Sequence, residues 1–328
     1  MMRYCWMRGA TLSLLLAPAG CVTIAAPDNP RPALPLPPEV ANRYALPGEV
    51  VEDYLLPIDR DRRVFRGRLS CGEEHPEFHL LLPVAAESAP FVLCLPILAG
   101  GRDLMWRVAE YLRHRGFAVA FGERVESAMK PHQDAEALEK LFRRSLVHNR
   151  AILAWARQQT FAAQGQIGLL GISTGGIMAG TLLALEPEIR GGVLILAGGD
   201  LPDLFMHSSE SRVRRWRAAR KTAEGLDEAG LYAQLRDKLH SDPAHTAAYV
   251  ATAKVLMVTA SWDTVVPARN SDLLWEALGR PERFKLLLLS HYSSILDVVL
   301  PTQTILGNSA RFLLGRLSTP APPPAHQR

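Results

Sequence analysis

The hydrophobic residues of this chain fall into short unbroken runs, separated by stretches in which apolar side chains recur at helical spacing. The runs are 91–95, 117–121 and 193–196, together with 167–170, 254–259 and 284–289, which are apolar apart from Gly168, Lys254, Thr259 and Lys285. Because they lack strict alternation, they are typical of parallel strands that are buried on both faces. Helical spacing is clearest in residues 103–115 and 134–159. Strands that alternate with helices predict an α/β fold with a parallel sheet and right-handed crossovers.

Two parts of the chain depart from this alternation. Residues 64–70 and 78–82 follow each other closely and predict an antiparallel hairpin at one edge of the sheet. The interval that follows the apolar run at 193–196 is longer than a normal crossover. It contains helical stretches near 209–224 and 226–240, which predict a helical insertion.

The pentapeptide at 171–175 reads Gly-Ile-Ser-Thr-Gly and lies between the apolar run at 167–170 and a helix-forming run at 177–185. A strand, a sharp turn and a helix around Gly-x-Ser-x-Gly are typical of a nucleophile elbow. The glycines leave room for the turn, and Ser173 would project above the sheet at a helix N-terminus, which favours negative charge. The pattern therefore indicates a nucleophilic serine.

An acid and a histidine follow this serine in the order that such a site requires. Asp263 comes after the apolar run at 254–259, and His291 comes after the run at 284–289. With Ser173, all three would lie at the carboxyl ends of parallel strands, where open α/β sheets bind ligands. The competing residues are the acids Asp200, Asp203 and Asp297, and the histidines His207, His240 and His245, which lack a preceding strand.

These motifs resemble the α/β-hydrolase superfamily, and within it the serine esterases and lipases of the dienelactone-hydrolase and carboxylesterase type. The resemblance covers roughly residues 77–317. It implies a mostly parallel twisted sheet of about eight strands, with helices on both faces and a helical, lid-like insertion after the sixth strand. The insertion would occupy about 201–251 of a hydrolase domain at 49–317.

The resemblance also implies the chemistry of acyl transfer. His291 would take the proton of Ser173, Asp263 would hold the histidine tautomer, and backbone N–H groups would bind the oxyanion. One of these N–H groups would belong to Thr174 and the other to Leu98. The loop at 96–101 departs from the His-Gly-x-Gly of many relatives, so Ile97 and Ala99 are alternative donors.

A carboxylic ester is the substrate that this resemblance favours, with an acyl-enzyme intermediate and with neither a cofactor nor a metal. Two other enzyme activities, those of a serine peptidase and of an acyltransferase, would use the same three residues. A lipoprotein that only binds a ligand in the pocket is the alternative from another class. An intact set of three residues argues against it, since binding alone does not need them.

The N-terminus has the features of an export signal. Residues 1–20 combine early arginines with a short apolar core, and small residues precede Cys21, as in bacterial lipoprotein signals. We therefore expect a signal peptide at 1–20, a lipid on Cys21, and a Pro-rich tether at 21–48 that anchors the protein to the membrane, facing the periplasm or the cell exterior. Simple secretion as a soluble protein is the alternative. Residues 318–328 would form a disordered tail.

The remaining composition adds two open questions. The net charge of +4 is too small to imply nucleic-acid binding. Cys71 and Cys94 could pair in an oxidising compartment, or they could be two small buried hydrophobes, which we favour. A basic cluster within the insertion is either a solvated helix face or a surface that attracts anions. It comprises Arg212, Arg214, Arg215, Arg217, Arg220 and Lys221.

Overall fold

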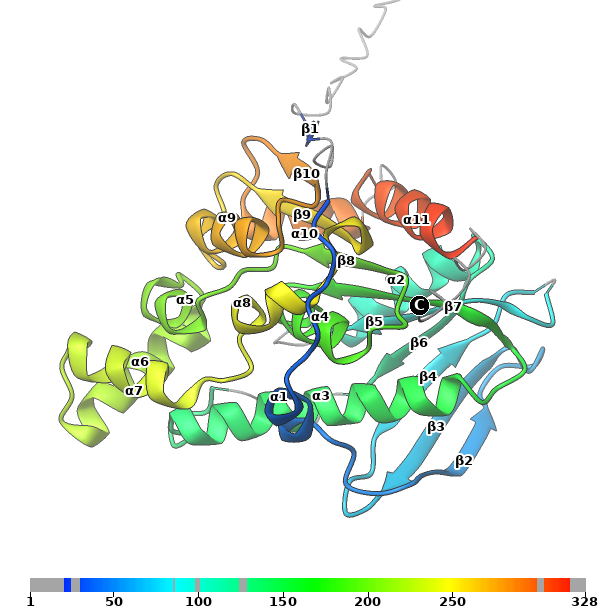
Figure 1. Ribbon diagram of the computed structural model, residues 1–328, viewed down its shortest axis with the longest axis horizontal. Coiled ribbons are helices and arrows are strands. Elements are labelled where there is room, and N and C mark those ends of the chain that lie inside the picture. The colour runs from blue at the N-terminus through cyan, green and yellow to red at the C-terminus, as the bar shows by residue number, and fades with distance from the viewer. Residues whose placement is uncertain are drawn as a thin grey trace, which may run out of the picture.

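A ten-stranded mixed sheet forms the centre of the molecule (Figure 1). The computed structural model describes residues 21–24, 30–84, 86–97, 101–123, 129–299 and 304–318. The strands are β1 (Cys21–Ile24), β2 (Val50–Pro57), β3 (Val64–Cys71), β4 (Glu77–Leu81), β5 (Ala89–Leu95), β6 (Ala118–Gly122), β7 (Ala162–Ile172), β8 (Gly191–Ile195), β9 (Val255–Ala260) and β10 (Glu282–Leu286). Their order across the sheet is β1-β10-β9-β8-β7-β5-β6-β4-β3-β2.

The α/β fold with a mostly parallel sheet is confirmed. Strands β5 to β10 are parallel to their neighbours among these six, whereas β1 and β2 to β4 run antiparallel. The predicted hairpin is β3 and β4. Two strands were missed. β2 is an edge strand that is largely exposed and carries charged residues, and β1 has only four residues, so neither has the apolar run that identifies a buried strand.

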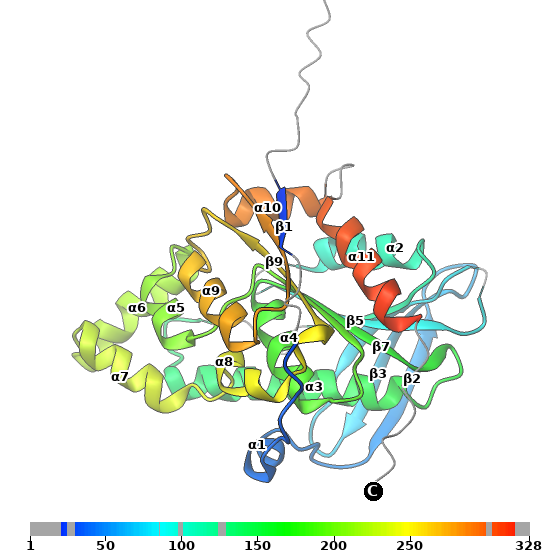
Figure 2. The ribbon, with the colours of Figure 1, turned by 45° about the horizontal axis from the view of Figure 1, so that its top comes forward.

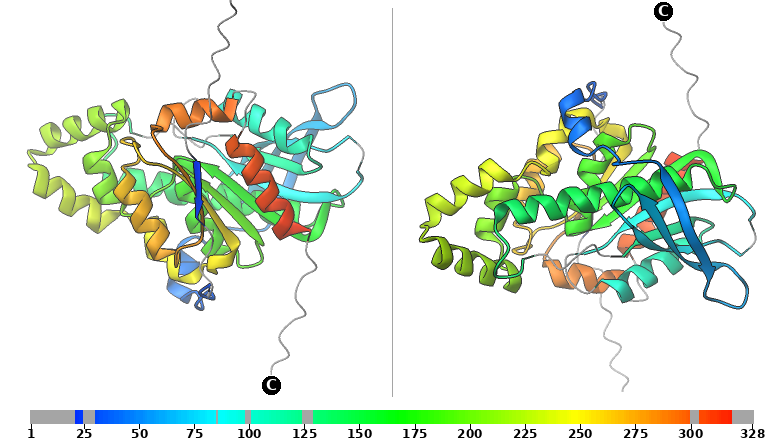
Figure 3. Two further views of the ribbon diagram at one scale, coloured as in Figure 1. Left: turned by 90° about the horizontal axis from the view of Figure 1, so that it is seen from above. Right: turned by 90° about the horizontal axis from the view of Figure 1, so that it is seen from below.

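Helices cover both faces of the sheet (Figures 1 and 3). On one face lie α3 (Ala135–Ala156), α4 (Thr174–Leu185) and α9 (Ala268–Ala277); on the other lie α2 (Arg102–Arg113), α10 (His291–Val299) and α11 (Thr304–Leu317). Sequence signals place these helices: α3 begins after Asp134, whose carboxylate accepts a hydrogen bond from the Ala137 amide at 2.7 Å. In β5, Leu93 faces the side covered by α3, α4 and α9, and Val92 faces the side covered by α2, α10 and α11, as expected for a strand buried on both sides.

The predicted insertion after β8 is helical and extends to the left of the sheet in Figure 1. It contains α5 (Leu201–His207), α6 (Ser211–Glu224) and α7 (Glu228–Lys238), followed by the short α8 (Pro243–Thr246) and two 3-10 turns, Ala247–Tyr249 and Thr252–Lys254. Trp216 of α6 is fully buried, and its indole N–H donates to the Gln133 carbonyl at 2.6 Å. The insertion is thereby packed against the segment that precedes α3. Its role as a lid stays a prediction.

The segment from Pro30 to Tyr44 differs from the extended tether that we expected. The Arg31 guanidinium donates to the carbonyls of Ala247 and Ala277 at 2.8 and 2.9 Å. The segment then forms α1 (Pro38–Arg43), and the Tyr44 side chain is buried. Proline-rich sequence predicts an extended chain, but it does not reveal whether that chain lies on a protein surface that satisfies its polar groups. The expected signal peptide at 1–20 and the tail beyond residue 318 lie outside the described residues.

Cys71 and Cys94 are both buried and unpaired, as small hydrophobic side chains would be. Burial raises the pKa of the Cys94 thiol far above its ordinary value, so this side chain remains a neutral thiol. Within the part of the chain that the structure describes, no helix is both long enough and apolar enough to cross a membrane.

Candidate active site

Ser173 sits on a sharp turn between the central strand β7 and helix α4. Its backbone has φ 55° and ψ −120°, a conformation that non-glycine residues rarely adopt. A Cβ atom at Gly171 would lie 2.2 Å from the Gly175 carbonyl oxygen, and one at Gly175 would lie 2.1 Å from that of Leu95. Both positions therefore require glycine, and the strained turn is the elbow that the sequence predicts. β7 lies beside β5 where the strand order reverses, which is where such sheets bind ligands.

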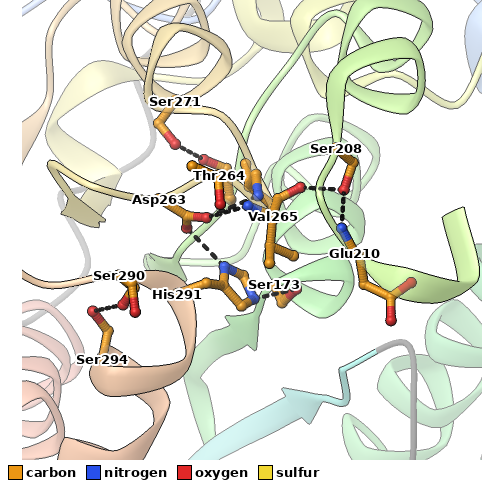
Figure 4. Close-up of polar contacts among 12 residues, drawn as sticks. Ser173, Ser208, Glu210, Asp263, Thr264, Val265, Ser271, Ser290, His291 and Ser294 are labelled. Carbon is orange, nitrogen blue, oxygen red and sulfur yellow. Dashed lines mark hydrogen bonds and ion pairs between the residues drawn. The ribbon is translucent and has the colours of Figure 1, made fainter. Parts of the chain in front are cut away.

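The structure brings Ser173, Asp263 and His291 together in one hydrogen-bonded chain (Figure 4). His291 Nε2 lies 3.1 Å from Ser173 Oγ, and His291 Nδ1 lies 2.7 Å from Asp263 Oδ2. All three side chains are buried. With Asp263 accepting the Nδ1 proton, Nε2 is left free to accept the hydroxyl proton, which is the arrangement that activates a serine nucleophile.

The loop after β9 holds Asp263 in place. Its second carboxylate oxygen, Oδ1, accepts hydrogen bonds from the amides of Val265 and Val266, both at 2.9 Å. These two bonds fix the plane of the carboxylate. The Asp263 side chain therefore presents Oδ2 to the imidazole in a single orientation.

We had expected His291 on a loop after the strand, but it is the first residue of α10. β10 ends at Leu286, three residues before the end of the apolar run, because the chain turns at Leu287 and Leu288. At the start of α10, the Ser290 amide donates to Ser293 Oγ at 2.8 Å. This bond is half of a capping box and stabilises the first helical turn, which carries His291.

The three alternative acids have other partners. Asp200 caps α5, where its carboxylate accepts a hydrogen bond from the Asp203 amide at 3.2 Å. Asp203 pairs with the Arg269 guanidinium at 2.8 Å. The carboxylate of Asp297 accepts from the Ile305 amide at 2.9 Å. The structure thus brings none of these carboxylates to His291.

Of the two expected oxyanion donors, the described residues include only Thr174. Thr174 is the first residue of α4, so its amide has no acceptor within the helix, and it adjoins Ser173 at the positive end of the helix dipole. Leu98 and Ala99 lie outside the described residues. Ile97 is described and lines the pocket beside Ser173 and Thr174.

An apolar pocket of about 140 Å³ opens beside Ser173. Among its walls are Ile177 of α4, Phe142 of α3, and Leu204 and Phe205 of α5. The rings of Phe142 and Phe205 stack with their planes 12° apart and their centroids 6.1 Å apart. Sequence analysis missed these wall residues, because each has the helical spacing of an ordinary core residue and only the fold brings them to one place.

The segment between α5 and α6 is bonded to the loop that carries Asp263 (Figure 4). The buried Ser208 hydroxyl donates to the Val265 carbonyl at 2.6 Å and accepts from the Glu210 amide at 3.2 Å. The Ser209 amide donates to the Thr264 carbonyl at 2.8 Å. The insertion therefore supports the acid loop as well as the pocket. No sequence motif marks Ser208, so its role was not predicted.

Two further side chains line the pocket, Glu210 and Tyr292. Glu210 accepts hydrogen bonds from the first amides of α6, so its carboxylate serves as the cap of that helix. Partial burial, together with the carboxylates of Glu210 and Asp263, raises the pKa of the Tyr292 phenol above its ordinary value. Tyr292 is therefore neutral at physiological pH and places an uncharged ring next to His291.

Half of the basic cluster has structural partners. Arg217 donates to the Phe205 carbonyl at 2.7 Å. Arg220 is buried and pairs with Glu224 at 3.1 Å, and Lys221 pairs with a carboxylate at the start of α7. The side chains of Arg217 and Lys221 are thus held by contacts within the insertion. These contacts favour a structural role for this part of the cluster.

The comparison with protein families gives a match over residues 107–291, a range that contains Ser173 and Asp263 and ends on His291. The matching family is the prolyl oligopeptidase family. The chain belongs to this family. A comparison with curated proteins found no match.

Solved structures with the same fold include esterases and a peptidase. An acetyl xylan esterase from a Paenibacillus species is 15% identical with a TM-score of 0.61, and the match covers 85% of this chain and 92% of the esterase. Another from a Thermoanaerobacterium species is 14% identical with a TM-score of 0.60, covering 84% and 92%. Pyrococcus horikoshii acylaminoacyl peptidase is 16% identical with a TM-score of 0.58, covering 77% of this chain and 41% of the peptidase. The α/β-hydrolase fold is thereby confirmed, and together with the family it identifies a serine hydrolase.

Proposed function

We propose that the protein hydrolyses carboxylic esters through an acyl-enzyme formed on Ser173. The observation that carries the proposal is the hydrogen-bonded chain from Ser173 through His291 to Asp263, at the mouth of a small apolar pocket. The position of each group in this chain suits one step of acyl transfer.

In the first half-reaction, His291 Nε2 takes the Ser173 proton as Oγ attacks the ester carbonyl carbon. The oxyanion accepts hydrogen bonds from the Thr174 amide and from a second amide, which we assign to Leu98. Asp263 stabilises the imidazolium, which then protonates the departing alcohol. In the second half-reaction, His291 takes a proton from water, the resulting hydroxide attacks the acyl carbon, and Ser173 regains its proton as the acid leaves.

The pocket supports an ester with a small apolar acyl group. Its volume of about 140 Å³ is close to that of a cavity of about 150 Å³ that binds benzene. The polar groups of Ser208 and Glu210 in its wall are already bonded to the protein, so an apolar group would lose no hydrogen bond on entering. The two acetyl xylan esterases of similar fold add support, as proteins whose names describe the removal of a small acyl group.

The test is a series of p-nitrophenyl esters of increasing acyl length, measured beside p-nitroanilides with the same acyl groups. We expect hydrolysis of the short esters, with kcat/KM far above that of the matched anilides. Preference for the anilides would favour a serine peptidase, which is the second candidate because of the family match and the acylaminoacyl peptidase fold. Transfer to an added alcohol in excess of hydrolysis would instead show an acyltransferase.

We also propose that the protein is a membrane-anchored lipoprotein with its lipid on Cys21. The support comes from the sequence, in which the apolar stretch at 12–17 and the small residues at 19–20 precede Cys21. In a bacterial host the protein should incorporate labelled fatty acid, and Cys21→Ser should abolish the incorporation. Absence of label on the unsubstituted protein would contradict the anchor and leave simple secretion.

A further inference from the structure

The exposed apolar side chains of the molecule are not scattered evenly, and four of them belong to the segments that carry Asp263 and His291. Trp262, Leu288, Tyr292 and Leu296 are 58%, 58%, 62% and 52% exposed. We call them the catalytic-edge patch. Trp262 precedes the acid Asp263 in the chain, and its amide donates to the Leu289 carbonyl at 3.0 Å, which brings it to the turn that carries Leu288.

The other two members of the patch lie on α10. Tyr292 follows His291 and lines the pocket, and Leu296 lies one helical turn further along the same helix. Three loops or helix turns at the carboxyl ends of β9 and β10 thus present a common apolar surface. Because Tyr292 belongs to both, this surface is continuous with the opening of the pocket.

The backbone at Leu288 adopts a conformation that is unfavourable for leucine. Its φ is 61°, in the left-handed region that bulky side chains rarely occupy. Such a residue costs free energy in the folded state, and an asparagine or glycine would adopt the same conformation with less strain. A leucine held in this conformation and directed into solvent is consistent with a surface that contacts an apolar medium.

The chain enters the domain at this same edge of the sheet. β1 pairs antiparallel with β10, and Cys21 is in register with Leu286, two residues before Leu288. Paired strands lie about 4.8 Å apart and rise about 3.4 Å per residue, so the backbone of Cys21 lies within about 10 Å of that of Leu288. Figure 2 shows β1 at the same end of the molecule as α10.

We infer that the catalytic-edge patch docks on a phospholipid bilayer, so that the active site opens toward the membrane. A lipid on Cys21, as proposed above, would hold the bilayer surface next to the patch and leave little length for the domain to turn away. Tryptophan and tyrosine are the side chains that favour the interface between water and hydrocarbon, because each combines an apolar ring with a polar atom. Burial of the two leucines would add to the affinity.

A second apolar edge provides a matched control. Val51, Leu56 and Ile58 on or beside β2 are 52%, 56% and 52% exposed, similar to the patch. β2 and β1 are the two outer strands of the ten-stranded sheet, so these residues lie at the opposite edge from Cys21. If exposed apolar residues alone caused contact with lipid, both edges would bind it equally.

The experiment places an environment-sensitive fluorophore on the full-length protein at Leu296→Cys or, as the control, at Leu56→Cys, each in a Cys5→Ser background. Cys71 and Cys94 are buried, and the protein without an added cysteine is labelled in parallel to measure the background. Vesicles contain phosphatidylethanolamine and a minority of phosphatidylglycerol, with or without bromine atoms on the acyl chains. We expect the emission of the label at 296 to shift to the blue and to lose most of its intensity to brominated lipid. The emission of the label at 56 should keep its wavelength and its intensity.

Three results would overturn the inference: no quenching at 296, equal quenching at 296 and 56, or a blue shift at 296 that grows with protein concentration in the absence of vesicles. The last would show a second copy of the chain on the patch. Fatty-acid incorporation at Cys21 is measured on the same samples. Quenching at 296 without the fatty acid refutes the anchor and retains the docking surface, and the reverse result refutes the docking surface alone.

A second arm of the experiment rests on the proposed ester hydrolysis. Leu288→Asn with Leu296→Ser should lower the rate on an ester dissolved in vesicles severalfold and leave the rate on a water-soluble ester unchanged. Neither residue lines the pocket, and asparagine suits the left-handed backbone at 288. Val51→Ser with Leu56→Ser is the matched control and should alter neither rate. Equal loss on both esters would show damage to the site, and no loss on either would contradict docking.

Discussion

Ser208 tests whether the helical insertion positions the catalytic acid. Its hydroxyl donates to the Val265 carbonyl at 2.6 Å, and the Val265 amide in turn donates to Asp263 Oδ1 at 2.9 Å. Ser208→Ala removes the first of these bonds and leaves a buried carbonyl without that donor, which costs about 1–3 kcal/mol. If all of this cost appeared in the transition state, kcat would fall between about fivefold and about 150-fold.

We expect a fall in kcat of about tenfold, because relaxation of the loop recovers part of this free energy. The assay is kcat and KM for a short p-nitrophenyl ester, with the free energy of unfolding measured on the same preparations. Ser208→Thr keeps the hydroxyl and should restore most of the activity. Ser209→Ala is the matched control: its hydroxyl bonds to the neighbouring Thr264 at 2.8 Å but is exposed, so its loss should change stability by less than about 0.5 kcal/mol.

A double-mutant cycle separates positioning of the acid from general destabilisation. In an Asp263→Asn background there is no charged acid left to position, so Ser208→Ala should cause little further loss of kcat. If Ser208→Ala lowers stability but leaves kcat unchanged, or if its effect on kcat is the same in both backgrounds, the reasoning is wrong and Ser208 only stabilises the fold.

Three further predictions follow from the same structure. Asp263→Asn should lower kcat by about 10⁴-fold, as in a serine protease with the same arrangement, whereas Asp200→Asn should lower it little; the reverse ranking, measured on one ester, would move the acid to the loop after β8. Phe205→Leu should deepen the pocket and move the maximum of kcat/KM to longer acyl chains. Each added methylene that fits into the pocket should raise kcat/KM about fourfold. An unchanged chain-length profile would contradict the assignment of the pocket as the acyl site. Burial alone would raise the pKa of Glu74, but hydrogen bonds from Arg144 and His148 lower this pKa overall. The charged carboxylate of Glu74 therefore stabilises the fold above about pH 4.3. This stabilisation is lost as the pH falls through the lower pKa that Glu74 has in the folded protein. Denaturant unfolding should therefore show Glu74→Gln destabilised at neutral pH and similar to the parent protein in acid, and a difference that does not depend on pH would refute this assignment.

The fold could be predicted from sequence where a pattern has a local physical cause. Strands such as β5 and β8 are buried on both faces and therefore read as unbroken apolar runs, and the glycine at 171 is required by contacts with the backbone of Gly175 and Gly176, a few residues along the chain. The order of Ser173, Asp263 and His291 carried the same kind of information, because each follows a strand whose end is fixed in space by the sheet.

The remainder depends on contacts between residues that are distant in sequence. The pocket walls on α3, α4 and α5 are ordinary core residues in the sequence, and only packing of the insertion brings them to Ser173. Ser208 acts through the Val265 carbonyl, a backbone group that no sequence pattern distinguishes. For the same reason the segment at Pro30 to Tyr44 looked like a tether, since its acceptors at Ala247 and Ala277 lie more than two hundred residues away.

Labelling by a fluorophosphonate tests the central claim most directly, because it requires both a nucleophilic serine and the base that activates it. We predict that the probe labels the protein on Ser173, that Ser173→Ala abolishes labelling and ester hydrolysis together, and that this variant unfolds at the same denaturant concentration as the parent protein. Labelling or ester hydrolysis that persists in the folded Ser173→Ala variant would place the nucleophile elsewhere and contradict the account.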